Sequence, residues 1–447
     1  MKLNLHYYDV YPKVVLVDRP EVITIKPLGA HAAFDGGYRL EVMNMSDGKY
    51  HLYPENGNMA VYDITVCEDG CLRLSHTFRK EDEHLIRIIR DGKTVADLSV
   101  YALDRDMAGR YPYRGDLHMH TCRSDGSQAP AIVAANYRKN GYDFMVISDH
   151  NRYYPSLEAQ DTYADVPLSF NIVRGEEVHL PGNDIHIVNF GGKYSVNGLL
   201  EHSPQNRESD RRAVIQDPPA MLTEEEYRSQ VNALIPQLSI PENVHAFSYA
   251  ACVWIFEHIR KAQGLGIFCH PYWRVGPYQV PDAFLRFMTE QHPFDAFEVL
   301  GGERYYEHNG FQTIHYYEDL ARGIHYPIVG STDSHNSLPE HSQGAMICST
   351  FVFAKENTDE SIIEAIKQEY SVAIDTISKE YRLVGSLRLA KYSRFLLDEV
   401  TPLHDELCFE EGRLMKLHAT GDPDGADGLR FLAGRMERFY QKYFHIS

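Results

Sequence analysis

The chain has no long apolar run, no paired cysteines and no excess of positive charge. No stretch of its 447 residues approaches the roughly 20 apolar residues that a membrane-spanning helix needs. The N-terminal MKLNLHYYDV contains no unbroken apolar segment, so we expect no signal peptide. These absences argue against a membrane protein and favour a cytoplasmic one.

Cysteine is scarce and scattered. The odd number and irregular spacing of the seven residues do not fit the disulfide framework that is typical of secreted domains. We therefore expect reduced thiols, which again indicates the cytoplasm. The seven are Cys67, Cys71, Cys122, Cys252, Cys269, Cys348 and Cys408.

Positive charge is in deficit, with 44 lysines and arginines against 63 aspartates and glutamates, a formal net charge of −19. Such an acidic chain gains nothing from counterion release, so we do not expect a long nucleic acid as partner. A small anionic substrate is compatible, because a local metal site can outweigh the overall charge. The length favours two or three domains, and the hydrophobic fraction of 43% is enough for their cores.

Residues 1–110 carry the pattern of short strands. Apolar and polar side chains alternate over residues 38–42 and 62–66, which is the period of half-buried strands. Dipeptides typical of hairpin turns occur at Asn56-Gly57, Asp69-Gly70 and Asp91-Gly92. The pattern predicts a small antiparallel β domain of the sandwich type, without a convincing catalytic cluster.

Between residues 111 and 375 apolar segments alternate with helical ones, which is typical of a parallel α/β barrel or sheet. Seven segments are predicted to be buried strands: GDLHMHT, YDFMVISDH, FNIVRGEEV, DIHIVNFG, LGIFCHP, FDAFEVLGG and YPIVGSTDSH. Three runs are predicted to be helices that end at a glycine: APAIVAANYRKNG, ACVWIFEHIRKAQG and FQTIHYYEDLARG.

Two segments depart from this alternation. A polar, proline-containing insertion at about 194–245 predicts either a lid over a site or a solvated loop. Residues 376–447 are predicted to form a helical C-terminal extension, with one helix face over 389–407 and a second run over 428–444 completing a helical hairpin. Such faces usually pack on their own chain, and a homo-oligomer contact is the alternative.

Histidines and carboxylates gather at the ends of the predicted strands. His118 and His120 are two residues apart, which places both on one face of a strand. In parallel α/β folds the C-terminal strand ends form one rim, where sites are built. His186 lies near the start of its strand, so a ligand and a mere polar partner are equally open for it. The candidate metal ligands are His118, His120, Asp125, His150, Glu177, His186, His270, Asp333 and His335.

Six imidazoles and three carboxylates suit zinc, manganese or iron. Nine donors exceed what one tetrahedral ion needs, so we expect two to three divalent ions. A site of this kind lowers the pKa of water and stabilises the attacking and leaving oxygens of a phosphate ester.

Other polar residues near these positions have separate predicted roles. Glu176 competes with Glu177 for one position. Glu298 either contacts a ligand or substrate or makes a structural hydrogen bond. Asp116 and Asp149 flank candidate ligands, and we expect them to orient an imidazole. The remaining candidates are expected to be surface histidines: His179, His202, His308 and His325.

The ordered set DLHMHTCRSDG, SDHN, GEE, DIHIVNFG, HP and SDSH resembles the polymerase and histidinol phosphatase (PHP) domain over roughly residues 112–375. The resemblance implies a distorted seven-stranded β/α barrel, preceded here by the β domain and followed by the helical tail. The family pattern Gly-x-Glu selects Glu177 over Glu176. Where some members have a histidine near Asp125, this chain has Gly126.

The resemblance also implies a trinuclear metal centre. One ion would be held by His118, His120, Glu177 and Asp333. Glu177 would bridge to a second ion, held with His186 and His270. The third would be held by Asp125, His150 and His335.

The function implied is that of a cytoplasmic metal-dependent phosphoesterase. Its substrate would be a small phosphorylated metabolite or nucleotide, hydrolysed by water that the ions activate, without a side-chain nucleophile. Arg274, Arg123 and Arg152 are candidates for binding the phosphate, because a guanidinium group matches two phosphate oxygens. For each of them a surface arginine is the alternative.

Two other functions stay open. Carbaryl-hydrolase-like relatives share the ligand pattern and often carry added domains, so the substrate could be a non-phosphate ester, a carbamate or an amide. A phosphate needs cationic groups around it, whereas a neutral ester needs an apolar pocket. The third function is a metal-stabilised binding module without catalysis.

Overall fold

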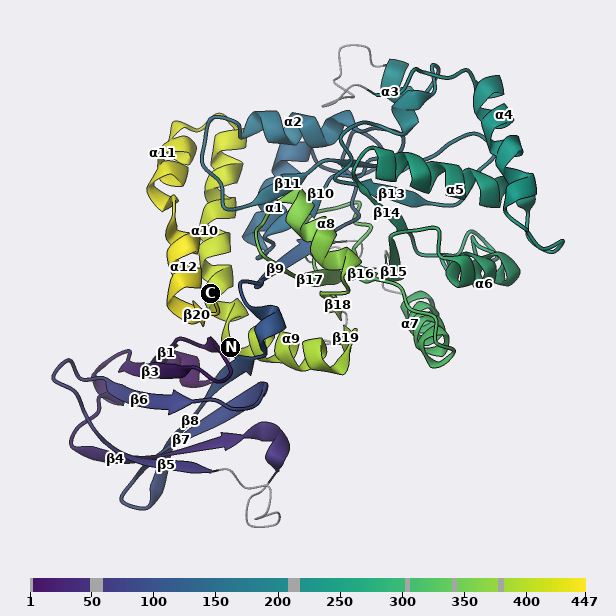
Figure 1. Ribbon diagram of the computed structural model, residues 1–447. Coiled ribbons are helices and arrows are strands. Elements are labelled where there is room, and N and C mark those ends of the chain that lie inside the picture. The colour runs from purple at the N-terminus through teal and green to yellow at the C-terminus, as the bar shows by residue number, and fades with distance from the viewer. Residues whose placement is uncertain (1–2, 49–58, 208–217, 302–305, 340–343, 377–381) are drawn as a thin grey trace. The chain divides into compact units, whose positions relative to one another are not determined.

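The computed structural model describes residues 3–48, 59–207, 218–301, 306–339, 344–376 and 382–447. The chain forms two compact units and contains both helices and strands, so the α/β class is confirmed (Figure 1). Unit 1 comprises Met1–Tyr111, Leu387–Leu407 and Gly434–Ser447, and unit 2 comprises Pro112–Ser386 and Cys408–Ala433.

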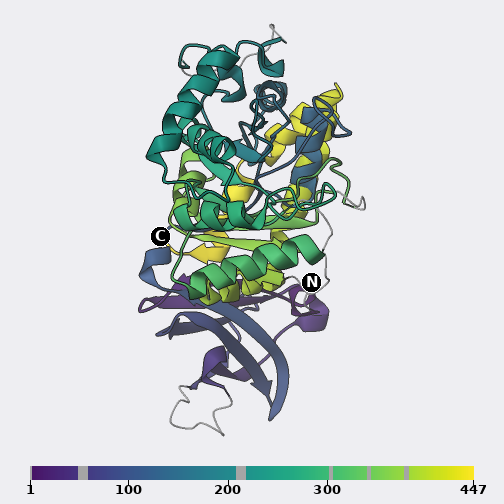
Figure 2. The same cartoon turned by 90° about the vertical axis from the view of Figure 1, so that its right-hand side faces the viewer.

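Unit 1 is built on two sheets that lie one over the other (Figures 1 and 2). The strand orders are β1-β3-β6 and β20-β2-β8-β7-β4-β5. The strands are β1 (Tyr8–Tyr11), β2 (Val14–Leu16), β3 (Pro20–Pro27), β4 (Gly37–Asn44), β5 (Ala60–Thr65), β6 (Leu72–Thr77), β7 (Asp82–Arg90), β8 (Lys93–Leu103) and β20 (Phe444–His445). Short 3-10 helices occupy Leu3–His6, Ala30–Ala32, Met45–Asp47 and Arg105–Met107.

The strand pattern of residues 38–42 and 62–66 is confirmed except at its last residue, because residues 38–42 lie in β4 and 62–65 in β5, which ends before Val66. The Asp91-Gly92 turn joins β7 to β8 with φ angles of 50° and 73°, as a two-residue hairpin requires. Asn56-Gly57 lies outside the described residues. The unit is not wholly antiparallel, since β2 pairs in parallel with both β8 and β20.

Unit 2 contains two further sheets, with strand orders β11-β10-β9-β17-β18-β19 and β12-β13-β14-β15-β16. A closed seven-stranded barrel is therefore not confirmed. The strands are β9 (Tyr111–Asp116), β10 (Phe144–Val146), β11 (Asn171–Val173), β12 (Gly175–Val178), β13 (Ile187–Phe190), β14 (Leu265–Phe268), β15 (Ala296–Leu300), β16 (Ile328–Gly330), β17 (Cys348–Ala354), β18 (Ser371–Asp375) and β19 (Arg382–Val384).

The second of these sheets is partly antiparallel, which corrects the expectation of a parallel arrangement. β13 runs antiparallel to both β12 and β14. Only residues 179–186 connect β12 to β13, whereas a parallel connection needs about a dozen residues or more. The predicted strand FNIVRGEEV is also divided, at Arg174, into β11 and β12 of different sheets.

The helices of unit 2 surround these sheets. They are α1 (Pro130–Lys139), α2 (Tyr154–Thr162), α3 (Pro204–Arg207), α4 (Glu224–Leu234), α5 (Ala246–Lys261), α6 (Asp282–Gln291), α7 (Tyr306–Ala321), α8 (Asp359–Lys367) and α11 (Pro423–Leu432). The three helices predicted to end at a glycine are confirmed as α1, α5 and α7. Among the described residues, no helix combines the length and the apolar character needed to cross a bilayer.

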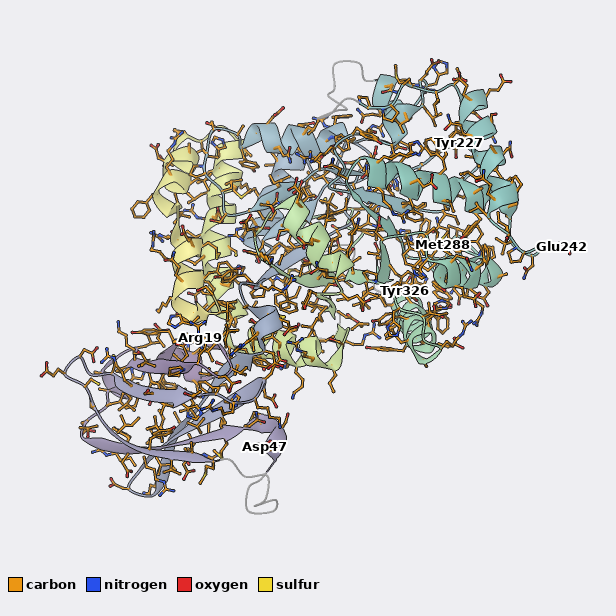
Figure 3. The ribbon with its side chains drawn as sticks, in the orientation of Figure 1. Arg19, Asp47, Tyr227, Glu242, Met288 and Tyr326 are labelled. Carbon is orange, nitrogen blue, oxygen red and sulfur yellow. The ribbon has the colours of Figure 1, made fainter. Side chains whose placement is uncertain are left out.

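The described part of the 194–245 insertion is folded. It contains α3, α4 and two 3-10 helices, Asn197–Leu199 and Ile235–Gln237. Tyr227 of α4, labelled in Figure 3, is fully buried, with its ring 5.2 Å from that of Trp254 on α5. A wholly solvated loop is therefore wrong for these residues. Residues 208–217 lie outside the described residues, and the lid stays a prediction.

The tail forms more helices than the predicted hairpin: α9 (Leu387–Glu399), α10 (Thr401–Ala419), α11 and α12 (Arg435–Tyr443). The helix predicted over 389–407 is interrupted after Glu399, because the ring of Pro402 clashes with the preceding turn of a continuous helix. Gly434, with φ of 75°, separates α11 from α12. Within unit 2, buried Arg138 of α1 pairs with Glu411 of α10 at 2.6 Å.

Candidate metal centre

The nine predicted ligands lie in one cluster of unit 2. Each has a donor atom no more than 3.8 Å from a donor atom of another. His118 and His120 do not lie within a strand as predicted, since β9 ends at Asp116 and both histidines follow it. Isolated backbone bridges join Met119 to Ser334 and His150 to Glu177, and so hold the ligand-bearing segments side by side.

His118, His120, Glu177 and Asp333 form the inner part of the cluster. His118 Nε2 is 3.4 Å from Glu177 Oε2 and 3.3 Å from Asp333 Oδ1. His120 Nε2 is 2.9 Å from the same Asp333 oxygen and 3.5 Å from the same Glu177 oxygen. Ligands about 2.1 Å from an ion lie roughly 3.0–3.4 Å from one another, so these spacings fit donors around one ion.

His186 reaches this cluster from the start of its strand. Its Nδ1 lies 2.6 Å from Glu177 Oε1. The antiparallel pairing of β12 and β13 explains the position, because Val178 at the end of β12 pairs with Ile187 at the start of β13. His270 approaches from the end of β14, with Nε2 at 3.8 Å from Asp333 Oδ2. These two histidines flank the inner donors on the side of β13 and β14.

Asp125, His150 and His335 form the rim. Asp125 Oδ2 is 3.4 Å from His150 Nε2 and 3.3 Å from His335 Nε2. The side chains are 53%, 26% and 24% exposed, respectively, whereas His118, His120 and Glu177 are completely buried. The cluster is thus closed on its inner side and open at the rim.

Several buried donor atoms of the cluster have no hydrogen-bond partner. They are His120 Nδ1, both carboxylate oxygens of Glu177 and both ring nitrogens of His270. An unsatisfied buried polar atom costs about 1–3 kcal/mol, so such a concentration is unfavourable unless another group satisfies it. Imidazole nitrogens and carboxylate oxygens are the donors that borderline divalent ions bind. The residues therefore fit divalent ions.

The protonation states of the cluster reinforce this conclusion. Burial opposes ionisation of Glu177 and Asp333, but the surrounding imidazoles outweigh it and lower the pKa of both carboxyl groups. Burial likewise opposes protonation of His150, but Glu177 and Asp125 raise its pKa to about 10. Burial dominates at His270 and lowers its pKa to about 3. The ionised carboxylates attract positive charge, which protons supply in the metal-free protein and metal ions can replace.

Glu298 and Glu176 have clearly different surroundings from Glu177. Glu298 Oε2 accepts a hydrogen bond from His118 Nδ1 at 3.0 Å, an arrangement that orients a metal-binding imidazole. Burial raises the pKa of Glu298 to about 7. Glu176 points away from the cluster and accepts hydrogen bonds from Ser195 Oγ at 2.6 Å and Asn197 Nδ2 at 2.9 Å. Of the two adjacent glutamates, Glu177 is the one that faces the cluster.

Asp116 and Asp149 accept hydrogen bonds from backbone N–H groups and not from imidazole rings. This corrects the prediction that they orient an imidazole. Asp116 accepts from the backbone N–H groups of His118 and Thr332. Asp149 accepts from the backbone N–H of Thr121 at 3.0 Å and from its hydroxyl at 2.7 Å. Both carboxylates therefore fix the loops that carry the ligands.

Gly126 is required by the loop that carries Asp125. A Cβ atom at this position would lie 2.6 Å from the carbonyl oxygen of His120, closer than real Cβ atoms approach. A histidine at position 126 would displace that backbone. Asp333 also has an unusual backbone, with φ of 47°, a conformation that costs on the order of 1–3 kcal/mol and is frequent at functional sites.

The prediction of surface histidines is wrong for two of four residues. His179 belongs to the cluster: its Nε2 is 2.8 Å from His150 Nδ1 and 3.6 Å from Glu177 Oε1. The spacing of two residues from Glu177 could have revealed it, as it did for His118 and His120. His308 is buried, whereas His202 and His325 are exposed.

The candidate phosphate-binding arginines have other partners. Arg123 makes two hydrogen bonds to Glu158, at 2.9 and 2.7 Å. Arg274, which is 57% exposed, lies 3.3 Å from Glu307. Arg152 donates to the carbonyl oxygen of His150 at 3.3 Å and is thus adjacent to a rim residue. The structure brings Arg152 to the backbone of a predicted ligand and pairs the other two with glutamates.

A polar cavity of about 490 Å³ adjoins the cluster at His179. Its walls come from the loops after β10 and β12 and from the insertion, and include Asn151, Asp184, His202 and Arg207. A cavity of this size accommodates a small organic molecule.

The seven cysteines form no disulfide, in agreement with the sequence.

No family model and no curated protein matches this chain. Solved structures resemble it at low identity. A two-domain protein from Bacteroides vulgatus that contains a predicted PHP-like metal-dependent phosphoesterase is 16% identical, with 59% of this chain and 65% of that chain covered and a TM-score of 0.38.

Two further structures resemble the chain. A protein from Bifidobacterium adolescentis assigned as a metal-dependent phosphoesterase is 18% identical, over 56% of this chain and 94% of that one, with a TM-score of 0.33. An amidohydrolase from Chromobacterium violaceum is 17% identical, over 51% of this chain and 89% of that one, with a TM-score of 0.31. At these scores the likenesses carry no conclusion about activity, so function is argued from the residues of this chain.

Proposed function

We propose that this chain is a metal-dependent phosphoesterase of the PHP type, acting on a small phosphorylated metabolite or nucleotide. The proposal rests on one observation: donors from separate segments converge on Glu177, and buried donor atoms among them lack hydrogen-bond partners. A cytoplasmic location, and the absence of a long nucleic acid partner, are proposed with it.

Most of the clustered residues would hold ions, and Glu298 would orient one of them. His118, His120, Glu177 and Asp333 would hold one ion, His186 and His270 would complete a second with Glu177, and Asp125, His150 and His335 would hold a third. Bound zinc, manganese or iron would lower the pKa of water and neutralise charge on phosphate oxygens. Glu298 would keep His118 in the orientation that binding requires.

The open rim is where the substrate would arrive. Exposure increases from Glu177 and His120 to His335, His150 and Asp125, and the cavity beside His179 lies next to the rim residue His150. The reacting phosphate would therefore lie at the rim, with the rest of the substrate in the cavity. Arg152 is a candidate to assist there, because its guanidinium donates to the carbonyl oxygen of the rim residue His150.

Hydrolysis of a neutral ester, carbamate or amide is the second candidate. Trp273 lies beside the cluster, with its ring 5.6 Å from that of His186 and 5.9 Å from that of His270. An aromatic surface suits an apolar acyl or aryl group, and the pairing of Arg123 and Arg274 with glutamates removes two cationic groups that a phosphate would use.

The test is hydrolysis by metal-stripped protein reloaded with zinc, manganese or iron. Phosphate release is measured for a panel of small phosphomonoesters and phosphodiesters, with a neutral aryl ester and an aryl carbamate alongside. Glu177→Ala is the blank, and exposed Glu290→Ala is the matched control. Phosphate release that is lost only in Glu177→Ala supports the proposal. Turnover of the neutral compounds alone replaces it with the second candidate.

A further inference from the structure

His179 occupies a position that the three predicted ligand sets leave unassigned. It follows β12 directly, two residues after Glu177. Its backbone N–H is held by Asn197 Oδ1 at 3.0 Å, and Asn197 also donates to the carbonyl oxygen of Glu177 at 3.0 Å. The histidine and the glutamate are therefore fixed by the same side chain.

The ring of His179 is directed at the metal donors. Its Nε2 lies 2.8 Å from His150 Nδ1 and 3.6 Å from Glu177 Oε1, and His150 Nδ1 lies 2.8 Å from Glu177 Oε2. The ring also lies 4.8 Å from that of His150 and 4.7 Å from that of His186. Three donor groups thus face one another across a small triangle.

His179 faces Glu177 Oε1 and His150 faces Glu177 Oε2, so the three groups are placed as two imidazoles beside a carboxylate that offers both oxygens. Ligands about 2.1 Å from an ion lie roughly 3.0–3.4 Å apart, and the separations of 2.8, 2.8 and 3.6 Å lie a few tenths of an ångström to either side of that range. Both Glu177 oxygens are buried without a hydrogen-bond partner, even though His150 Nδ1 and His186 Nδ1 lie within 2.8 Å of them. These short contacts place imidazole nitrogens beside carboxylate oxygens, which are donors that one ion can bind.

From this geometry we propose that His179 is a further metal ligand, binding an ion together with Glu177 and Nδ1 of His150. Because one imidazole binds an ion through Nδ1 or Nε2 but not both, this ion replaces the assignment of His150 to the third ion. The ion would lie on the side of the centre that faces the 490 Å³ cavity, because His179 also lines that cavity. This inference rests on the metal centre of the proposed function. It adds a tenth ligand and places an ion where a bound substrate in the cavity would contact it.

Metal binding tests the inference independently of hydrolysis. Stripped wild-type protein, His179→Ala and the control His202→Ala are loaded with Co²⁺ and dialysed, and the ions per chain, the dissociation constants and the visible Co²⁺ spectrum are measured. His202 is a matched control, because it lines the same cavity but is exposed. We expect His179→Ala to lose at least about tenfold in affinity for one ion and to change the Co²⁺ spectrum, while His202→Ala behaves as wild type.

A second variant separates loss of a ligand from loss of folding. In His179→Gly, added imidazole can enter the vacated space and is expected to restore the bound ion and the spectrum. Unchanged affinity and spectrum in His179→Ala would overturn the proposal, and so would reduced affinity with an unchanged spectrum, which indicates that His179 only positions His150. If the wild type binds the ions but hydrolyses no phosphate compound, the proposed function fails and the ligand assignment stands.

Discussion

The inner and rim parts of the donor cluster use the same side-chain types in opposite surroundings. The inner residues His118, His120, Glu177 and Asp333 are at most 14% exposed, whereas Asp125, His150 and His335 keep between 24% and 53% of their side-chain area exposed. Burial strengthens electrostatic attraction and removes competing water. We therefore expect the inner donors to hold an ion tightly, and the rim donors to hold an ion that exchanges and meets the substrate.

Glu177 is an inner residue that also contacts the rim, so its removal is the largest expected perturbation. Its oxygens lie 3.4 Å from His118 of the inner part and 2.8 Å from His150 of the rim. Glu177→Ala should lose ions from both parts and reduce kcat/KM by about 10²–10³-fold, the typical effect of removing one group that stabilises the transition state. Elemental analysis together with hydrolysis rates checks this. Full metal content in the variant would refute the shared role.

Glu298 acts on the inner part alone, because its carboxylate contacts His118. Glu298→Ala should weaken the inner ion by about 10–100-fold, as is typical for groups that orient a ligand. The affinity of Glu298→Gln for the inner ion should lie between those of wild type and Glu298→Ala, because its amide oxygen still accepts a hydrogen bond. Competition with a chelator measures these affinities. Glu411→Gln is the control: it disturbs the buried pair with Arg138 and should lower stability without changing metal affinity.

The rim should respond to pH, because the pKa of His150 is raised to about 10 in the metal-free protein. A metal ion must displace that proton, so affinity at the rim should rise about tenfold per pH unit for each proton released, up to that pKa. His150→Gln should flatten the dependence. Calorimetric titrations between pH 6 and 9 test this, and a rim affinity independent of pH would contradict it.

The raised pKa of His150 also makes the stability of the metal-free protein depend on pH. Here a rise in pH reduces the stabilising contribution, whereas it increases the metal affinity. His150 has a folded pKa above its unfolded value, so its stabilising contribution is complete below about pH 6.5 and is lost as the pH rises towards 10. The difference in Tm between wild type and His150→Gln should therefore decrease over this range. A difference that grows with pH would contradict the assignment.

Arg274 lies outside both parts and should matter least. Its guanidinium is exposed and paired with Glu307, an ion pair of a kind that contributes at most about 1 kcal/mol. Arg274→Ala should change KM by less than about threefold, a smaller effect than that of Arg152→Ala. Steady-state kinetics of both variants, on whichever substrate is found, checks the order of the two effects on KM. A larger effect at Arg274 would restore it as a phosphate-binding residue.

The convergence of the nine candidate donors on one cluster was predictable, because they follow buried strands and their order along the chain resembles one family. The direction of β13 was missed, and with it the reason why His186 reaches the cluster. Residues 179–186 are too few for a parallel crossover, so loop length alone favours the antiparallel pairing that the structure has.

Other features depend on contacts that lie far apart in the sequence. Nothing local distinguishes Asp149, which holds the backbone of Thr121, from a residue that orients an imidazole. The two-residue strand β20 pairs with β2 across more than 400 residues, and such a short segment carries no periodic signal. Conversely, the i, i+2 spacing of Glu177 and His179 was visible and would have identified His179.

The most direct test of the metal centre is anomalous X-ray scattering from crystals of the metal-loaded protein, recorded at the absorption edge of the bound metal. We predict at least two peaks around Glu177, one between His118, His120 and Asp333 and another towards His186 and His270. Absence of any peak within bonding distance of the Glu177 carboxylate, in crystals whose metal content is confirmed, would contradict this prediction.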